Sequence, residues 1–97
     1  MSRHLTRRMV GLDTYHFYYD AVRVGIVCEQ MRVGETLWTW QCGFYPGAPI
    51  REHRIGEAPT LEFACAAFKQ AWTEYLPRRT PAEFAAWHAD RRGHRRA

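Results

Sequence analysis

Apolar and polar residues alternate in the first half of the chain, as expected of strands that bury one face. One alternating segment spans residues 22–29, where the face expected to be buried consists of Val22, Val24, Ile26 and Cys28. Gly25 within this segment indicates a β-bulge or close packing by a large neighbour. Residues 15–19, which read Tyr-His-Phe-Tyr-Tyr, are aromatic and β-prone and predict a further short strand.

A second alternating segment, residues 37–44, places two tryptophans on the same side of a strand. Trp38 and Trp40 share one face, and the polar residues Thr39 and Gln41 mark the opposite, solvent-facing side. We therefore predict that both indole rings belong to the core. The hydroxyl and amide groups of Thr39 and Gln41 would remain free to meet a partner.

Glycine and proline separate the strand segments. Residues 33–35, Val-Gly-Glu, predict a hairpin turn between the two alternating segments. Residues 45–49, Tyr-Pro-Gly-Ala-Pro, end the second strand because proline lacks a backbone donor and has a fixed φ. Residues 50–55 carry charge throughout and are predicted to return as a short edge strand.

The clearest helical pattern spans residues 61–76. Thr60 precedes it as a suitable N-cap, and apolar side chains recur every three or four positions to give one broad apolar face. Phe68 and Trp72 on this face are predicted to pack in the core with the two tryptophans of the sheet. A second helix begins after Thr80, where the sequence Thr-Pro-Ala-Glu forms a capping box.

These elements predict an α+β fold. Its antiparallel sheet has three strands, or four if residues 15–19 join it, and it packs against one main helix with a short C-terminal helix added. The length of 97 residues fits one domain, near the lower end of what buries a sufficient core. We expect residues 1–10 to form a flexible basic arm, residues 11–90 to form the domain, and residues 91–97 to form a basic disordered tail.

The formal net charge of +4 is concentrated at the two ends of the chain. Residues 1–8 contain three arginines and no carboxylate, and residues 77–97 contain six arginines and two carboxylates. Residues 9–76 contain five cationic residues and eight carboxylates, so the middle of the chain is mildly acidic. This distribution argues against a domain that is basic over its whole surface.

The hydrophobic runs are too short for a membrane protein. The longest, residues 63–68, falls far short of a membrane span. The first 20 residues lack the apolar core of a secretory signal. We therefore expect a cytoplasmic protein without membrane association.

No catalytic or metal-binding motif is present in the sequence. It lacks G-x-S-x-G, a phosphate loop, H-E-x-x-H and zinc-type spacing, so we expect no enzymatic activity, no cofactor and no metal. Cys28, Cys42 and Cys65 form an odd set without a C-x-x-C pair, and their apolar-phase positions predict buried, reduced thiols. A Cys28–His16 or Cys42–His53 pair would have to be assembled by the fold.

A surplus of aromatic side chains favours a non-enzymatic binding module. A strand with one inner face cannot bury the whole aromatic run at residues 15–19, and the second helix adds further apolar surface. The candidate interface residues are Tyr15, Phe17, Tyr18, Tyr19, Phe84 and Trp87. The expected partner is another protein or a second copy of the chain. In the alternative arrangement, the N-terminal segment and the second helix bury these side chains against the sheet.

Nucleic-acid binding is the second hypothesis for function. Arginine, glutamine and threonine on an exposed sheet face are the side chains that recognise base edges, and arginine-rich ends neutralise phosphates. The candidate residues are Arg23, Thr39, Gln41, Arg51, Arg54, Arg78 and Arg79. Glu29 and Glu52, expected near the same surface, favour an ordinary solvated face instead.

Four short motifs carry a resemblance to known proteins. They are Arg23-Val24-Gly25, Trp38-Thr39-Trp40, Gly56-Glu57-Ala58-Pro59-Thr60 and Ala71-Trp72. With these motifs the chain resembles, over about residues 22–72, a family of small uncharacterised bacterial proteins. The resemblance implies a shared fold and no particular activity.

The order strand–strand–strand–helix, with a threonine opening the helix, is also similar to the arm-type DNA-binding domains of tyrosine recombinases. Those domains lay an exposed sheet face in the major groove. This chain lacks their densely basic strands.

Overall fold

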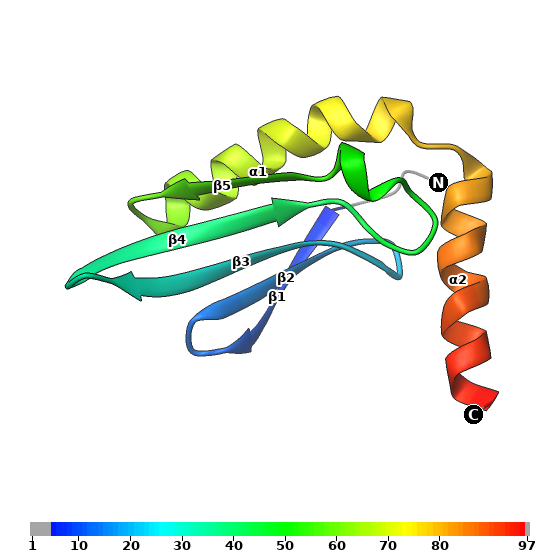
Figure 1. Cartoon of the computed structure of the whole chain (residues 1–97), viewed down its shortest axis with the longest axis horizontal. Helices are drawn as coiled ribbons and strands as arrows, with labels where there is room; N and C mark the ends of the chain where they lie inside the picture. The colour runs from blue at the N-terminus through cyan, green and yellow to red at the C-terminus, as the bar shows by residue number, and fades with distance from the viewer. Residues whose placement is uncertain (1–4, 97) are drawn as a thin grey trace.

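Over the residues that the structure describes, 5–96, five antiparallel strands form a meander with α1 across one face and α2 at one end (Figure 1). The structure is a computed structural model, and it describes side chains for residues 5–92. The strands are β1 (Leu5–Gly11), β2 (Thr14–Tyr19), β3 (Val22–Arg32), β4 (Glu35–Cys42) and β5 (Arg54–Ala58). The helices are η1 (Ile50–Glu52), α1 (Leu61–Tyr75), η2 (Leu76–Arg78) and α2 (Pro81–Arg96). The predicted α+β fold is confirmed.

The sheet has more strands than the sequence pattern predicted. Residues 5–10, expected to be part of a flexible arm, form most of β1 and pair with β2, with Leu5 opposite Tyr19 and Met9 opposite Tyr15. The free edge of β2 needs hydrogen-bond partners for its backbone, and β1 provides them. Residues 1–4 of the expected arm lie outside the described residues. The last strand begins at Arg54, after the 3₁₀ turn η1. The prediction of a strand over residues 50–55 was therefore wrong in its bounds.

A β-bulge in β3 changes which of its residues face the core. Gly25 pairs with Phe17 and Arg23 pairs with Tyr18, so one residue of β3 has no partner between them. Val24 and Val27 are therefore both buried, whereas Ile26 and Cys28 turn to the other face, contrary to the simple alternation. Close packing at the glycine is also confirmed, because a Cβ there would lie 2.0 Å from the Phe68 ring.

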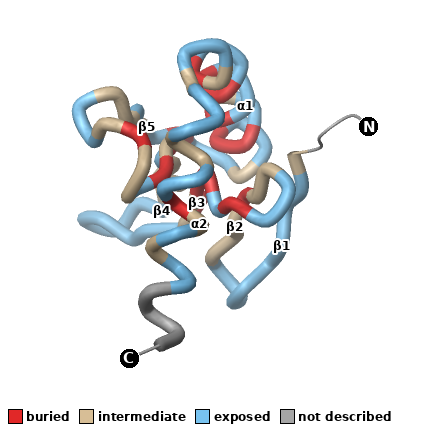
Figure 2. The backbone as a smooth tube through the Cα atoms, turned by 90° about the vertical axis from the view of Figure 1, so that its right-hand side faces the viewer, coloured by how far each residue is buried: buried red, intermediate tan, exposed pale blue. Residues whose placement is uncertain are grey.

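The core lies between the sheet and α1, where the buried positions of both face each other (Figure 2). Phe68 and Trp72 are buried as predicted. Trp38 and Trp40 do point to the α1 side of the sheet, but they are half-buried and pack against the rim of the core. A Cβ at Gly56 would lie 2.6 Å from the Trp40 indole, so this ring covers the backbone of β5.

Both helix starts follow the capping signals in the sequence. The Thr60 hydroxyl accepts a hydrogen bond from the Phe63 backbone N–H at 3.1 Å. Thr80 and Glu83 form the reciprocal capping box, with side chain to backbone distances of 3.2 and 2.7 Å. The backbone of residues 91–96 continues α2 instead of forming a separate tail, and residue 97 lies outside the described part. Among the helices of the described residues, none is long and apolar enough to cross a lipid bilayer.

Candidate nucleic-acid interface

The sheet has one face covered by α1 and one face that we call the open face. Because residues paired across antiparallel strands point to the same side, the strand register assigns every position to one of the two faces. Toward the end of the sheet at which α2 stands, the open face carries Arg8, His16, Tyr18, Arg23, Ile26 and Gln41. The guanidinium group of Arg8 lies over the Tyr18 ring at 5.4 Å from its centroid.

Three of the candidate nucleic-acid contacts come together on the open face. They are Arg23, Thr39 and Gln41, and they lie on the adjacent strands β3 and β4. Arg54 instead points to the α1 side, where its Nη1 pairs with Glu74 at 2.5 Å. Arg51 lies in η1, outside the sheet.

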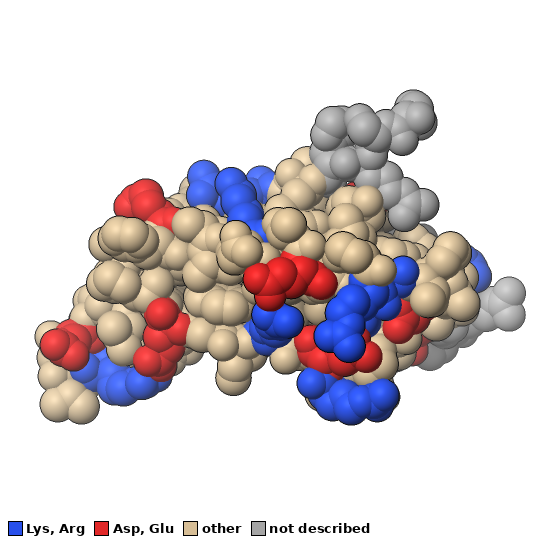
Figure 3. Space-filling model, turned by 90° about the horizontal axis from the view of Figure 1, so that it is seen from above, with Lys and Arg blue, Asp and Glu red and all other residues tan. Residues whose placement is uncertain are grey.

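The carboxylates expected to oppose binding lie away from this surface. Glu29 is paired with Trp38 and therefore points to the α1 side, and Glu52 lies in η1 beside Arg79. Among the described strand residues of the open face, the carboxylates are those of Glu35 and Glu57, at the end remote from α2. Glu57 is paired with Arg32 at 2.6 Å. On the α1 side, acidic and basic side chains are intermixed (Figure 3).

Where the open face meets α2, a cleft of about 260 Å³ is present, which we call the α2 cleft. Arg23 and Gln41 line it from the sheet, Tyr45 and His53 from the loop between β4 and β5, and Trp87 and Arg91 from α2. Arg91 lies over the Trp87 ring at 4.7 Å. No carboxylate is among the described residues that line this cleft. The cleft is therefore an electropositive corner with aromatic walls.

A second hollow adjoins the α2 cleft on the open face and holds about 410 Å³; we call it the β4 groove. The polar side chains lining it are those of Gln30, Arg32, Thr39, Gln41 and Glu57. Gln41 lines both hollows, so the two are neighbours along β4. Amide and hydroxyl groups in the groove offer donors and acceptors of the kind that recognise base edges.

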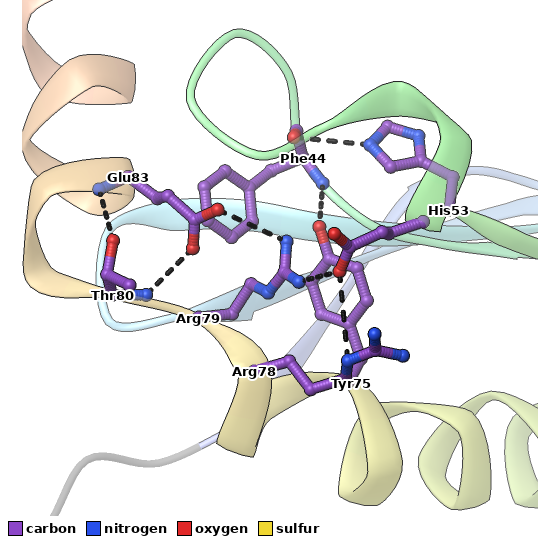
Figure 4. Close-up of polar contacts among 8 residues, drawn as sticks. Phe44, His53, Tyr75, Arg78, Arg79, Thr80 and Glu83 are labelled. Atoms are coloured by element: carbon purple, nitrogen blue, oxygen red, sulfur yellow. Dashed lines mark hydrogen bonds and ion pairs between the residues drawn. The ribbon is translucent and has the colours of Figure 1, made fainter.

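A buried arginine holds α2 in place (Figure 4). Arg79, in the link to α2, has a side chain only 1% exposed, which lies over the Tyr75 ring at 4.1 Å and hydrogen-bonds to Glu52. Its Nη1 also lies 3.6 Å from Glu83 in the first turn of α2. Arg79 therefore joins η1, α1 and α2, and its burial removes it from the candidate nucleic-acid contacts. Arg78 is exposed and lies 4.0 Å from Glu52, away from the open face.

Most of the candidate interface residues have side chains that are buried in the hydrophobic core or pack against it. Phe17 and Trp87 are buried, and Tyr15, Tyr19 and Phe84 pack against the core. Only Tyr18 of this set lies on the open face, according to the register of the described strands. The N-terminal strand and the second helix thus bury the aromatic surplus, which is the alternative arrangement considered for it.

The cysteine–histidine pairs are not assembled as nucleophilic sites. Burial raises the pKa of Cys42 to about 12, so its thiol stays protonated at neutral pH. The Nε2 atom of His53 lies 3.2 Å from the Phe44 carbonyl oxygen, with which it forms a hydrogen bond. Cys28 hydrogen-bonds to Thr14 and to the backbone of Glu29. Partial burial, aided by the charge of Arg23, lowers the pKa of His16 and favours its neutral ring.

Within residues 5–92, no group of three or more His, Cys, Asp and Glu side chains is arranged to hold a metal ion. The sequence indicated Arg8 and Arg91 only as phosphate-neutralising residues of basic ends, because β1 and the direction of α2 carry no clear sequence signal, and it did not indicate that His16 lies on the open face. No family model matches the chain, and neither a curated protein nor a solved structure matches it.

Proposed function

We propose that the protein is a non-enzymatic module that binds single-stranded nucleic acid on its open face. The observation that carries this proposal is the charge arrangement in the α2 cleft. Arg23 and Arg91 line it together, and no carboxylate does so among the described residues. An electropositive surface bordered by hydrogen-bonding groups suits an anionic polymer with base edges.

The shape of the surface favours a single strand over a duplex. The major groove of a duplex accepts a protruding helix or ribbon, whereas the open face offers hollows: the α2 cleft beside α2 and the β4 groove along the sheet. Tyr45, which is 60% exposed at the cleft, and Tyr18 offer rings on which an unpaired base can stack. Gln41 and Thr39 then lie beside such a base.

The sequence also favoured protein contacts or self-association, and that hypothesis rested on a surplus of exposed aromatic side chains. Of the aromatic side chains counted as candidate interface residues, all but Tyr18 pack in or against the core of the monomer. We therefore place nucleic-acid binding first. The three free thiols fit a reducing, cytoplasmic setting for this function.

The test is fluorescence anisotropy with a labelled oligonucleotide of about 12 nucleotides, single-stranded or duplex. We expect the single strand to bind more tightly, with affinity falling as salt rises from about 50 to 200 mM. Arg23→Ala should weaken binding and reduce the slope of log affinity against log salt by about 0.7. The matched control is Arg54→Ala, which removes the same charge from the α1 side.

Two results would contradict the proposed function. One is the absence of salt-dependent binding at about 100 μM protein, the weak end of non-specific affinities. The other is an equal loss of affinity in Arg23→Ala and Arg54→Ala, which would mean that net charge alone governs binding.

A further inference from the structure

We propose that the α2 cleft binds the terminal phosphate monoester of a nucleic-acid strand, an inference that rests on the proposed function. Arg23 reaches the cleft from β3 and Arg91 from α2, so two guanidinium groups from distant parts of the chain line one small space. Gln41 adds an amide donor to the lining of the same cleft. Planar guanidinium groups form paired hydrogen bonds with phosphate oxygens.

The two arginines are available to a ligand. Neither Arg23 nor Arg91 forms an ion pair with a carboxylate of the described residues, whereas Arg32, Arg54 and Arg79 each do. Arg91 is braced by the nearly buried Trp87 ring beneath it. A braced guanidinium loses less conformational freedom when it binds an anion.

The size and charge of the cleft fit a phosphate monoester. Its volume of about 260 Å³ is below the range of about 300–1,000 Å³ typical of pockets that enclose whole drug-sized ligands. A phosphate monoester carries about −1.5 to −2 charges at neutral pH, whereas an internal diester carries one. Two arginines without an ion-pair partner among the described residues therefore complement an end of the strand better than an internal phosphate.

The position of the cleft also indicates an end of the strand. The β4 groove and the α2 cleft lie next to each other on the open face and share Gln41 in their linings. Beyond the cleft stands α2, which crosses the end of the sheet from the α1 side to the open side (Figure 1). A strand lying in the groove would meet α2 as a wall, so its terminal phosphate would occupy the cleft.

The experiment compares four forms of one single-stranded oligonucleotide: 5′-phosphorylated, 3′-phosphorylated, unphosphorylated and circular. We expect one of the two phosphorylated ends to raise affinity about tenfold over the hydroxyl end, the effect of a charged hydrogen bond. Arg91→Gln should weaken the binding of all four forms and, in addition, abolish the preference for the phosphorylated end. Arg92→Gln is the matched control, since Arg92 is an exposed neighbour on α2 that does not line the cleft.

The outcomes separate this inference from the proposed function. Equal affinity for all four forms overturns the terminal-phosphate site and leaves single-strand binding intact. If no oligonucleotide binds, the proposed function fails, and the cleft is titrated with a nucleoside monophosphate and with inorganic phosphate. Saturable NMR shifts at the Trp87 indole that disappear in Arg91→Gln would support a phosphate-monoester site for free ligands. Their absence would overturn it.

Discussion

The two faces of the sheet present their arginines in different electrostatic settings. On the α1 side, Arg54 pairs with Glu74, and Arg7 lies over Tyr15 with its guanidinium directed at the Cys65 sulfur. On the open face, Arg32 pairs with Glu57 at the end remote from α2, whereas Arg23 lines a cleft without a carboxylate partner among the described residues. The difference teaches that pairing, which a count of charges does not show, decides whether an arginine is available to a ligand.

The two faces also differ in packing, because only one of them is covered by α1. A substitution in α1 at this covered face should cause the largest loss of stability. Phe68 is fully buried, and its ring lies 4.3 Å from that of Phe17. Phe68→Ala should lower the free energy of unfolding by about 3–5 kcal/mol because it leaves a cavity. Phe63 on the same helix is 64% exposed, so Phe63→Ala is the matched control. Similar urea midpoints for the two variants would contradict the packing.

The next largest effect should come from the buried arginine at the end of the sheet. Arg79→Ala leaves Glu52 and Glu83 without their buried partner and should cost about 3 kcal/mol of stability. Arg78→Ala, at the neighbouring exposed position, should cost less than about 1 kcal/mol. Urea denaturation compares the two. An equal loss in both would mean that Arg79 does not fix α2 against the sheet.

The same ion pair should make stability depend on pH. The hydrogen bond from Arg79 lowers the pKa of Glu52 below its ordinary value of 4.5. A lowered pKa in the folded state gives stability that is present above the ordinary pKa and lost as pH falls through the folded pKa. Thermal unfolding between pH 7 and 3 should show this loss, and Glu52→Gln should make it smaller. The control Glu35→Gln, at the remote hairpin, should keep the wild-type dependence.

Sequence patterns predicted the features that depend on near neighbours. The capping residues Thr60 and Thr80 and the inward phase of Trp38 and Trp40 are set within a few positions of the chain. Local rules suffice for such features because helix and strand periodicities are properties of the segment itself. The fold class follows from them.

The features that were missed depend on contacts between distant segments. The sequence indicated a bulge or close packing at Gly25, but it did not predict that the bulge at Val24 reverses the inward phase of the rest of β3, as a side-chain period of two requires. Arg79 is buried only because η1, α1 and α2 meet around it. The α2 cleft requires the direction of α2, which no residue pattern in the helix reveals. For these reasons the sequence placed Arg23 and Gln41 on the exposed sheet face, whereas it indicated Arg91 only as one arginine of a basic tail and did not predict the cleft.

The smallest expected effect tests whether availability, and not net charge, governs the open face. Glu57→Gln would release Arg32 on this face, whereas Glu62→Gln removes one negative charge from the first turn of α1. We expect Glu57→Gln alone to raise single-strand affinity two- to threefold, because one more phosphate contact steepens the salt slope by up to about 0.7. Anisotropy titrations at two salt concentrations measure both quantities. Equal gains in the two variants would show that binding follows the total charge, and the distinction between the two faces would then have no bearing on function.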